Sequence, residues 1–194
     1  RGPVSPFYIK PDLVAPGAFI NTTDINGNYK ISSGTSFAAP HVAGTAALIL
    51  QKNPELTPQE VKSILMTTTD IVYDQFNDRF PINVSGNGRV NASNAISADL
   101  IIMPPNLIFD LSSANQIQTK DLEIRGIDDQ SASVRFEENY AADFDYSLDG
   151  KNMTINAKLT QQNLGYFESR IIISHNEIDY HIPIIVRVSE GAIT

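Results

Sequence analysis

The 194-residue chain contains no cysteine, which excludes disulfide bonds and thiolate metal sites. It also has no run of 18 or more apolar residues, so no membrane-spanning helix is expected. The sequence starts on arginine rather than methionine and shows no signal peptide, and we therefore expect a segment of a longer protein. Its length is sufficient for one large domain or two small ones, each with a buried core.

Positive charge is scarce in the second half of the chain. Residues 1–98 hold 7 Lys and Arg against 7 Asp and Glu, whereas residues 99–194 hold 7 against 15. The whole net charge of −8 therefore lies in the second half. An acidic surface repels phosphate backbones, which argues against a nucleic-acid partner. The same asymmetry indicates a domain boundary near residue 100.

Helix signals are confined to the first half. Residues 38–50 are rich in alanine and leucine and predict a helix that ends before Asn53-Pro54. This helix is apolar nearly all round, which is typical of a helix buried in the middle of a domain. Gly44 lowers its intrinsic stability, which indicates close packing against a neighbour.

A second helix has the clearest start in the sequence. Thr57 is a candidate N-cap, Pro58 occupies the first helical position, and Glu60 completes a capping box. A third, short helix is expected over residues 91–98, and residues 103–106, Met-Pro-Pro-Asn, are expected to form a linker.

Strand patterns dominate the second half. In the first half, only a short strand over residues 13–15 and a hairpin turn at Asn26-Gly27 are expected. After residue 106, apolar residues alternate with polar ones in about seven short segments, with a hairpin turn at residues 148–152. This spacing predicts an all-β sandwich of the immunoglobulin or fibronectin III type. The expected segments are 107–111, 122–124, 134–136, 144–148, 153–159, 167–173 and 180–188.

Ser36 lies where the turn-forming residues 32–35 meet the apolar helix. Serine is a preferred helix N-cap, and caps are far commoner than nucleophiles. A serine at a helix N-terminus also faces free backbone N–H groups and the positive end of the helix dipole, which together would stabilise an oxyanion. From the residues alone, both interpretations stay open.

Four sequence blocks decide between them, because in this order they resemble the C-terminal part of the catalytic domain of subtilisin-like serine proteases, the subtilases. The blocks cover about half the chain. They are RGP at residues 1–3, KPDLVAPG at 10–17, SGTSFAAPHVAG at 33–44 and GNGRVNASNA at 86–95.

This resemblance implies a fold class and a set of site residues. Residues 1–102 are expected to be the C-terminal portion of a three-layer α/β/α catalytic domain, so the fold class is α/β, followed by the β-sandwich over residues 103–194. Ser36 is the implied nucleophile, and its backbone N–H would donate to the oxyanion. Thr35 is a candidate helper in the oxyanion hole, while Ser32, Ser33 and Gly34 would bind substrate. No metal ligand is implied.

The chain departs from the family in lacking the rest of the triad. Subtilases carry the general-base histidine, its aspartate and an oxyanion-hole asparagine well before the serine block, and no histidine precedes Ser36 here. His41 lies five residues later, on a different helix face, so we interpret it as a packing residue. His175 and His181 are expected to be ordinary surface residues, since His181 alternates with inward-facing Ile182.

Five aspartates in the second half allow two interpretations. Carboxylate oxygens suit a structural Ca²⁺ ion, but the spacing fits no standard calcium loop, which favours a solvated acidic face. No cofactor is required by the resemblance. The residues concerned are Asp128, Asp129, Asp143, Asp145 and Asp149.

The expected function is that of a secreted or cell-surface serine endopeptidase acting on protein or peptide substrates, with this chain carrying only the serine of the triad. Its expected partner is the N-terminal part of the same protease. Without that part, residues 1–98 should expose a large apolar patch around the helix after Ser36. The alternative is a non-catalytic surface or adhesion module that retains a subtilase scaffold.

Overall fold

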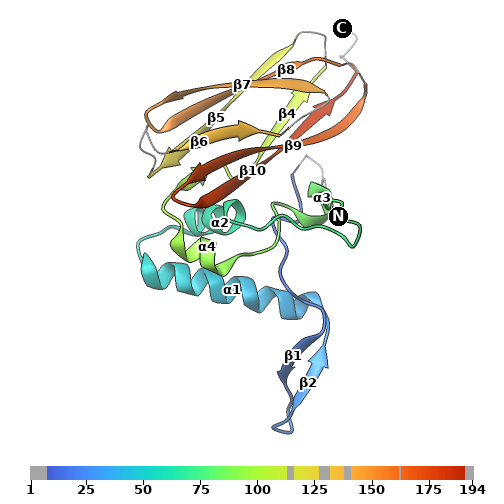
Figure 1. Ribbon diagram of the computed structural model, residues 1–194, viewed down its shortest axis with the longest axis vertical. Coiled ribbons are helices and arrows are strands. Elements are labelled where there is room, and N and C mark those ends of the chain that lie inside the picture. Colours follow the sequence, from blue (N-terminus) through green and yellow to red (C-terminus); the bar gives the residue numbers. More distant parts are fainter. Residues whose placement is uncertain (1–7, 113–115, 127–131, 138–140, 162, 191–194) are drawn as a thin grey trace.

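A computed structural model describes residues 8–112, 116–126, 132–137, 141–161 and 163–190. Helices and a small hairpin make up residues 8–98, here called the helical half, and two sheets make up residues 99–190, the β half (Figure 1). The elements of the helical half are β1 (Ile20–Thr23), β2 (Tyr29–Ser32), α1 (Thr35–Lys52), α2 (Pro58–Thr67), α3 (Ile82–Ser85) and α4 (Ala92–Ser97). The strands of the β half are β3 (Ile101–Met103), β4 (Leu107–Leu111), β5 (Ile117–Arg125), β6 (Ser133–Phe136), β7 (Ala142–Asp149), β8 (Asn152–Leu159), β9 (Gly165–His175) and β10 (Ile178–Val188).

Local signals in the sequence place α1, α2, α4 and two hairpins correctly, whereas the single-turn helix α3 was not predicted. The capping box at the start of α2 is present: the Glu60 N–H donates to Thr57 Oγ1, and the Thr57 N–H donates to Glu60 Oε2 at 2.7 Å. Helix α1 ends at Lys52, before Asn53-Pro54 as expected. The two predicted hairpins, β1–β2 and β7–β8, are antiparallel pairs.

Two strand predictions need correction. The expected strand at residues 13–15 is only an isolated bridge between Val14 and Arg89. Strand β3 was missed, because three residues are too few to show an alternating pattern; it pairs with β5 immediately before the bend at residues 104–106. The seven segments predicted after residue 106 correspond to β4–β10.

The β half consists of two four-stranded sheets packed face to face. One has the order β4-β10-β9-β6, with β4 and β10 parallel, and the other has the order β3-β5-β8-β7. Their inner faces share one apolar core, in which Phe109, Ile155 and Tyr180 are fully buried. Alternation along the strands drives this arrangement, because successive side chains point to opposite faces of a sheet.

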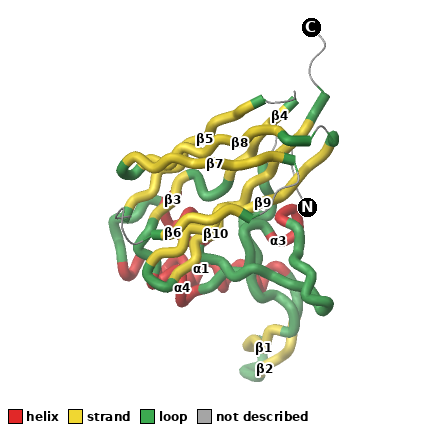
Figure 2. Tube along the Cα trace, turned by 45° about the horizontal axis from the view of Figure 1, so that its top comes forward, coloured by secondary structure: helices red, strands yellow, loops and turns green. Residues whose placement is uncertain are grey.

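The outer face of the first sheet packs on the helical half, so this sheet lies between the other sheet and the helices (Figure 2). Ile185 of β10 contacts Ile82 of α3 and Ile9 in a small apolar cluster. On the other side of the junction, Ser63 of α2 donates its hydroxyl to the Ile102 carbonyl at 2.5 Å. The two halves therefore meet through apolar and polar contacts.

The two histidines of the β half are buried in this junction, which contradicts the expectation that they lie at the surface. His181 is 8% exposed and His175 is 6% exposed. The alternation argument was correct that His181 and Ile182 face opposite sides, but the side opposite Ile182 is covered by the helical half. Burial, with a smaller contribution from the nearby Arg170 charge, lowers the pKa of His181.

Asp99 fixes the first residues of the β half against strands β9 and β10, beside His175. Its carboxylate accepts a hydrogen bond from the Tyr180 hydroxyl at 2.8 Å and lies 3.1 Å from His175 Nδ1. Burial alone would raise the pKa of Asp99, but hydrogen bonds from Asn176, Tyr180 and His175 outweigh burial and lower that pKa. Burial raises the pKa of Tyr180 to about 12, so its hydroxyl keeps the proton that it donates.

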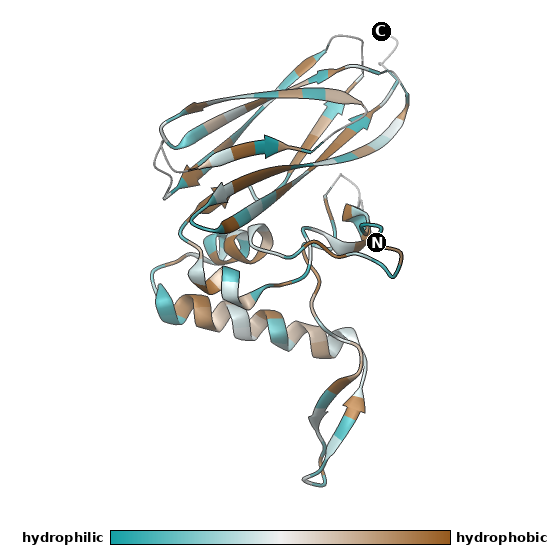
Figure 3. Cartoon of the chain, viewed as in Figure 1, coloured by the Kyte–Doolittle hydropathy of each residue, from teal (hydrophilic) through white to brown (hydrophobic). Residues whose placement is uncertain are grey.

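Helix α1 is covered on one side only. Among its 18 residues only Thr45 and Ile49 are buried, and Leu48 is 44% exposed. Figure 3 shows apolar residues along this helix, and Leu48 and Leu50 among them are exposed, in line with the expected apolar surface. The expected close packing at Gly44 is wrong for the described residues, since a Cβ built there meets nothing within 4 Å. None of the helices in the described residues is long and apolar enough to cross a membrane.

The lowered pKa of His181 predicts acid-sensitive stability. At pH values between the two pKa values of His181, the histidine is protonated in the unfolded state and neutral in the folded state. The free energy of unfolding therefore falls as the pH drops below about 6.5, the pKa of an unfolded histidine. His181→Gln should make the unfolding free energy less steep between pH 7 and pH 5, by at most about 1.4 kcal/mol per pH unit. Urea unfolding at a series of pH values measures this slope.

The control is Gln51→Ala, which replaces an exposed, non-titrating residue of α1 and should leave the slope as it is. The same slope for His181→Gln and the unaltered chain would show that His181 does not carry this pH dependence.

Candidate active site

Ser36 is the second residue of α1, and its side chain is exposed. The N-cap position belongs to Gly34, and no side chain caps this helix. The N-cap interpretation of Ser36 is therefore wrong. Within the described residues its hydroxyl makes no hydrogen bond, so it is available to an outside group.

The turn that leads into α1 is held by the last residue of the KPDLVAPG block and by the segment that follows it. The Gly34 N–H donates to the Gly17 carbonyl at 2.7 Å, and the Phe19 N–H donates to Ser33 Oγ at 2.9 Å. Gly17 is required here, because a Cβ on it would lie 2.8 Å from the Gly34 oxygen. The sequence analysis did not predict that Gly17 and Phe19 contribute to the site, although Gly17 is the last residue of the KPDLVAPG block.

The predicted site residues are contiguous, so chain connectivity alone brings them together. Ser32 ends β2 and is half-buried, whereas Ser33 and Gly34 are exposed in the turn. Thr35 opens α1 and is exposed. All of them surround the N-terminus of the helix, where Ser36 lies, on a surface that a ligand can reach.

The start of α1 is an electropositive position. Its first turn contains no acidic residue that would compensate the helix dipole. The first N–H groups of a helix have no partner within the helix, so they can donate to an anion beside Ser36. The arrangement suits a negative charge that develops on an oxygen next to the serine.

No general base for Ser36 is present in the described residues. His41 is exposed, not packed as expected, and its Nδ1 lies 2.8 Å from the Phe37 carbonyl one turn earlier on α1. His175 and His181 lie in β9 and β10, on the far side of α2 from α1 (Figure 1). Within the described residues, no side chain therefore lies where it could remove the proton of the Ser36 hydroxyl.

An apolar groove of about 610 Å³ runs between α1 and α2. Leu13, Val42, Ala46, Val61 and Leu65 are among its lining residues. Such a lining suits packing against other apolar side chains and offers few polar groups to orient a substrate.

The carboxylates of the β half form no recognisable cation site. Asp143, Asp145 and Asp149 are exposed on β7, while Asp128 and Asp129 lie outside the described residues. In the part of the chain that the structure describes, no group of three or more His, Cys, Asp or Glu residues could hold a metal ion.

Comparison with known proteins gives one family. Residues 1–98 match the model of the peptidase S8 group, described as the subtilase family. The minor extracellular protease Vpr of Bacillus subtilis (strain 168) is 33% identical over 158 residues, which cover 77% of this chain and 19% of Vpr. Serine protease AprX of the same organism is 41% identical over 110 residues, which cover 50% of this chain and 24% of AprX. The chain therefore spans about a fifth to a quarter of the length of these relatives.

The match to Vpr covers more of the chain than residues 1–98, so this similarity continues into the β half. Among solved structures, the M1 domain from titin matches with a TM-score of 0.31 and 8% identity, over 50% of this chain and 99% of that domain.

The close approach of Gly17 to Gly34 predicts that Gly17→Ala is costly. The added methyl group would displace the turn before Ser36, and overpacking of this kind costs about 1–3 kcal/mol. Gly44→Ala is the matched control: it has free space and should stabilise the helix by about 1 kcal/mol. Denaturant unfolding of both variants measures the two effects, and equal stability of the two would contradict the geometry described for Gly17.

Proposed function

The chain belongs to the subtilase family, and we propose that it supplies Ser36 as the nucleophile of a serine endopeptidase. The observation that carries this proposal is the exposed Ser36 hydroxyl at the start of a long helix, free of any capping role. The relatives named above are proteases, which supports the same reaction here.

In the proposed reaction, Ser36 Oγ attacks the carbonyl carbon of a peptide bond and loses its proton to a histidine base. The Ser36 N–H donates to the oxyanion, and the Thr35 hydroxyl assists it. The amine of the scissile bond leaves with the proton, and an ester remains on Ser36. Water then hydrolyses the ester with the help of the same base. Ser32, Ser33 and Gly34 contact the substrate beside the scissile bond.

We further propose that the histidine, its aspartate and the oxyanion-hole asparagine come from an N-terminal part of the same protease. The uncovered side of α1 and the apolar groove against α2 support this. So does the hairpin β1–β2, which extends beyond the end of α1 and exposes Ile25 and Ile31 (Figure 1). An added segment of α/β structure would bury these surfaces and complete the site.

The remaining proposals concern organisation and location. Residues 1–98 form the C-terminal portion of the catalytic domain, and residues 99–194 form an immunoglobulin-like or fibronectin-like sandwich; the boundary lies before the expected residue 102, because β3 (Ile101–Met103) pairs with β5 of the sandwich. The protease is secreted or attached to the cell surface, which the extracellular description of Vpr supports. It acts on proteins or peptides without a cofactor, and any bound Ca²⁺ has a structural role.

A serine-directed fluorophosphonate tests the nucleophile. It should label the complete natural protein stoichiometrically at Ser36, and Ser36→Ala should abolish the labelling. Residues 1–194 alone should react only slowly, because nothing in the described residues removes the proton. Ser93→Ala is the matched control, since Ser93 is also an exposed second residue of a helix but lies in α4.

Labelling that persists in Ser36→Ala, or a complete protein that never reacts, would contradict the enzyme proposal. The second result would favour the non-catalytic surface or adhesion module.

The proposed cover on α1 has its own test. Leu48→Gln should change the stability of residues 1–194 by no more than about 0.5 kcal/mol, because Leu48 is exposed there. In the complete protein the same substitution should cost about 2–5 kcal/mol, because Leu48 would be buried in an apolar core. Thermal and denaturant unfolding of both forms measures the difference.

Gln51→Ala, an exposed polar position on the same helix, should be neutral in both forms. A small effect of Leu48→Gln in the complete protein would show that this side of α1 stays uncovered.

A further inference from the structure

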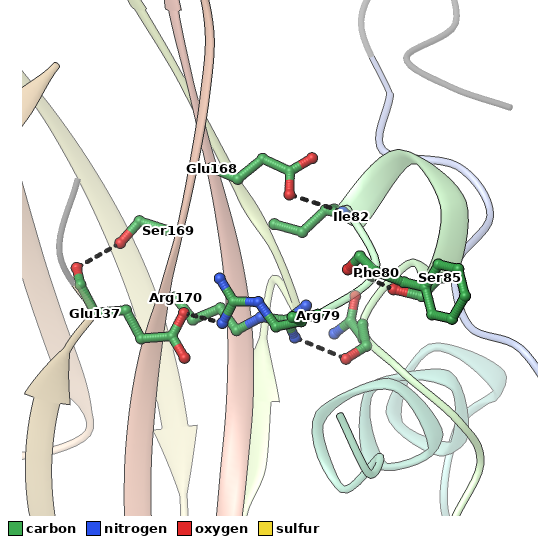
Figure 4. A network of polar contacts seen from close by, with 9 residues as sticks. Arg79, Phe80, Ile82, Ser85, Glu137, Glu168, Ser169 and Arg170 are labelled. Atoms are coloured by element: carbon green, nitrogen blue, oxygen red, sulfur yellow. Dashed lines mark hydrogen bonds and ion pairs between the residues drawn. The ribbon is translucent and has the colours of Figure 1, made fainter. Parts of the chain in front are cut away.

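Arg170 of β9 is a buried cation at the junction between the halves. Its side chain is 1% exposed, and its Nη1 donates to the Asn87 carbonyl at 2.8 Å. Burial lowers the pKa of Arg170 to about 10, so the guanidinium keeps its charge at neutral pH. The nearby charge of Arg79 lowers this pKa further, whereas the carboxylates of Glu137 and Glu168 favour the charged form; Figure 4 shows these side chains together.

The turn that Arg170 contacts makes further hydrogen bonds to residues of the β half. Asn87 Nδ2 donates to the Pro105 carbonyl at 3.2 Å and to the His181 carbonyl at 3.4 Å. At the start of α3, the Ile82 N–H donates to Glu168 Oε2 at 2.8 Å (Figure 4). Side chains and carbonyls of the β half therefore determine where residues 82–87 lie.

The same turn holds the segment that leads toward Ser36. The Asn87 N–H donates to the Asp12 carbonyl at 3.0 Å, and the Val14 N–H donates to the Gly88 carbonyl at 2.9 Å. The contact is close: a Cβ on Gly86, whose φ is +60°, would lie 2.4 Å from the Pro11 carbonyl oxygen. Backbone packed at this distance transmits a displacement, because no flexible side chain lies between the two segments.

The last contact reaches the nucleophile. Three residues after Val14, the Gly17 carbonyl accepts the Gly34 N–H at 2.7 Å, and Gly34 is the N-cap of the helix that carries Ser36. The Arg170 side chain thus binds the turn at Asn87, and backbone hydrogen bonds connect this turn through segment 12–17 to the start of α1.

We propose that the β half positions the nucleophile, and that Arg170 is the positioning residue through which it acts. This inference rests on the proposed function. Arg170 touches neither substrate nor the reacting atoms. It fixes the turn at residues 86–88, which fixes segment 12–17 and with it the position of Gly34 and Ser36. Rates of acyl transfer depend steeply on such placement, since a misplacement of about 1 Å costs on the order of 100-fold.

The test uses the complete natural protein and compares Arg170→Met with Arg135→Met. Both remove a cation from the outer face of the same sheet, but Arg135 is exposed, and among the described residues its ion-pair partner is Asp179 alone. Arg170→Met should lower kcat toward a peptide substrate by about 10-fold or more. KM should stay within about twofold, because the substrate-binding surface is intact. Arg135→Met should leave both constants unchanged.

Two measurements separate positioning from stability. All rates are taken well below the thermal midpoint of each variant, where circular dichroism shows the native signal. The rate of fluorophosphonate labelling at Ser36 should fall in parallel with kcat. Arg170→Lys, which keeps the charge and one donor, should recover part of the lost rate.

If Arg170→Met does not fold, Asn87→Ala tests the same turn: it removes both bonds of the Asn87 side chain to the β half, keeps the bond from Arg170 to the carbonyl of residue 87, and should also lower kcat. A folded variant with the kcat of the unaltered protein would overturn the positioning role while leaving the proposed function intact. An unaltered complete protein that neither cleaves peptides nor reacts with the fluorophosphonate would overturn both.

Discussion

The two-sided burial of strands β9 and β10 is the constraint on which the rest of this structure depends. One face of this pair carries Tyr180 and Ile182 into the core of the β half. The opposite face carries Arg170, His181 and Ile185 against the helical half. Because both faces are covered, a shift of either strand would disturb the core and the junction together. The helical half is therefore packed directly on the outer face of this sheet.

The opposite side of the helical half has no such partner. Helix α1 is composed like a central helix, yet only Thr45 and Ile49 are buried, while the junction side is closely packed. Proteins of this size rarely leave so apolar a helix exposed, because the free energy of burial is then unused. The difference in burial between the two sides is explained if another segment packs on the exposed side of α1. Ser36 is exposed on the same helix.

Local patterns predicted most of the elements, and long-range contacts account for the errors. The capping box at Thr57 and the hairpin glycines act within a few residues, so they can be recognised without the fold. His175 and His181 could not, because their burial depends on the helical half covering a face that alternation assigns to solvent. The site shows the same division: the family resemblance selected Ser36, but only the structure shows that Gly34 is the N-cap and that Gly17 sets the turn.

The polar contacts of the junction fix the relative position of the two halves as well as stabilising their contact. Burying an arginine is costly, and an apolar side chain of similar volume would often stabilise such an interface at least as well. Arg170 Nε has no hydrogen-bond partner among the described residues, so this cost is only partly offset. What a guanidinium adds is direction: its bond to the Asn87 carbonyl has a narrow range of lengths and angles, whereas apolar surfaces tolerate sliding. A directional contact is the kind expected where the exact placement of a turn affects a reaction at its far end.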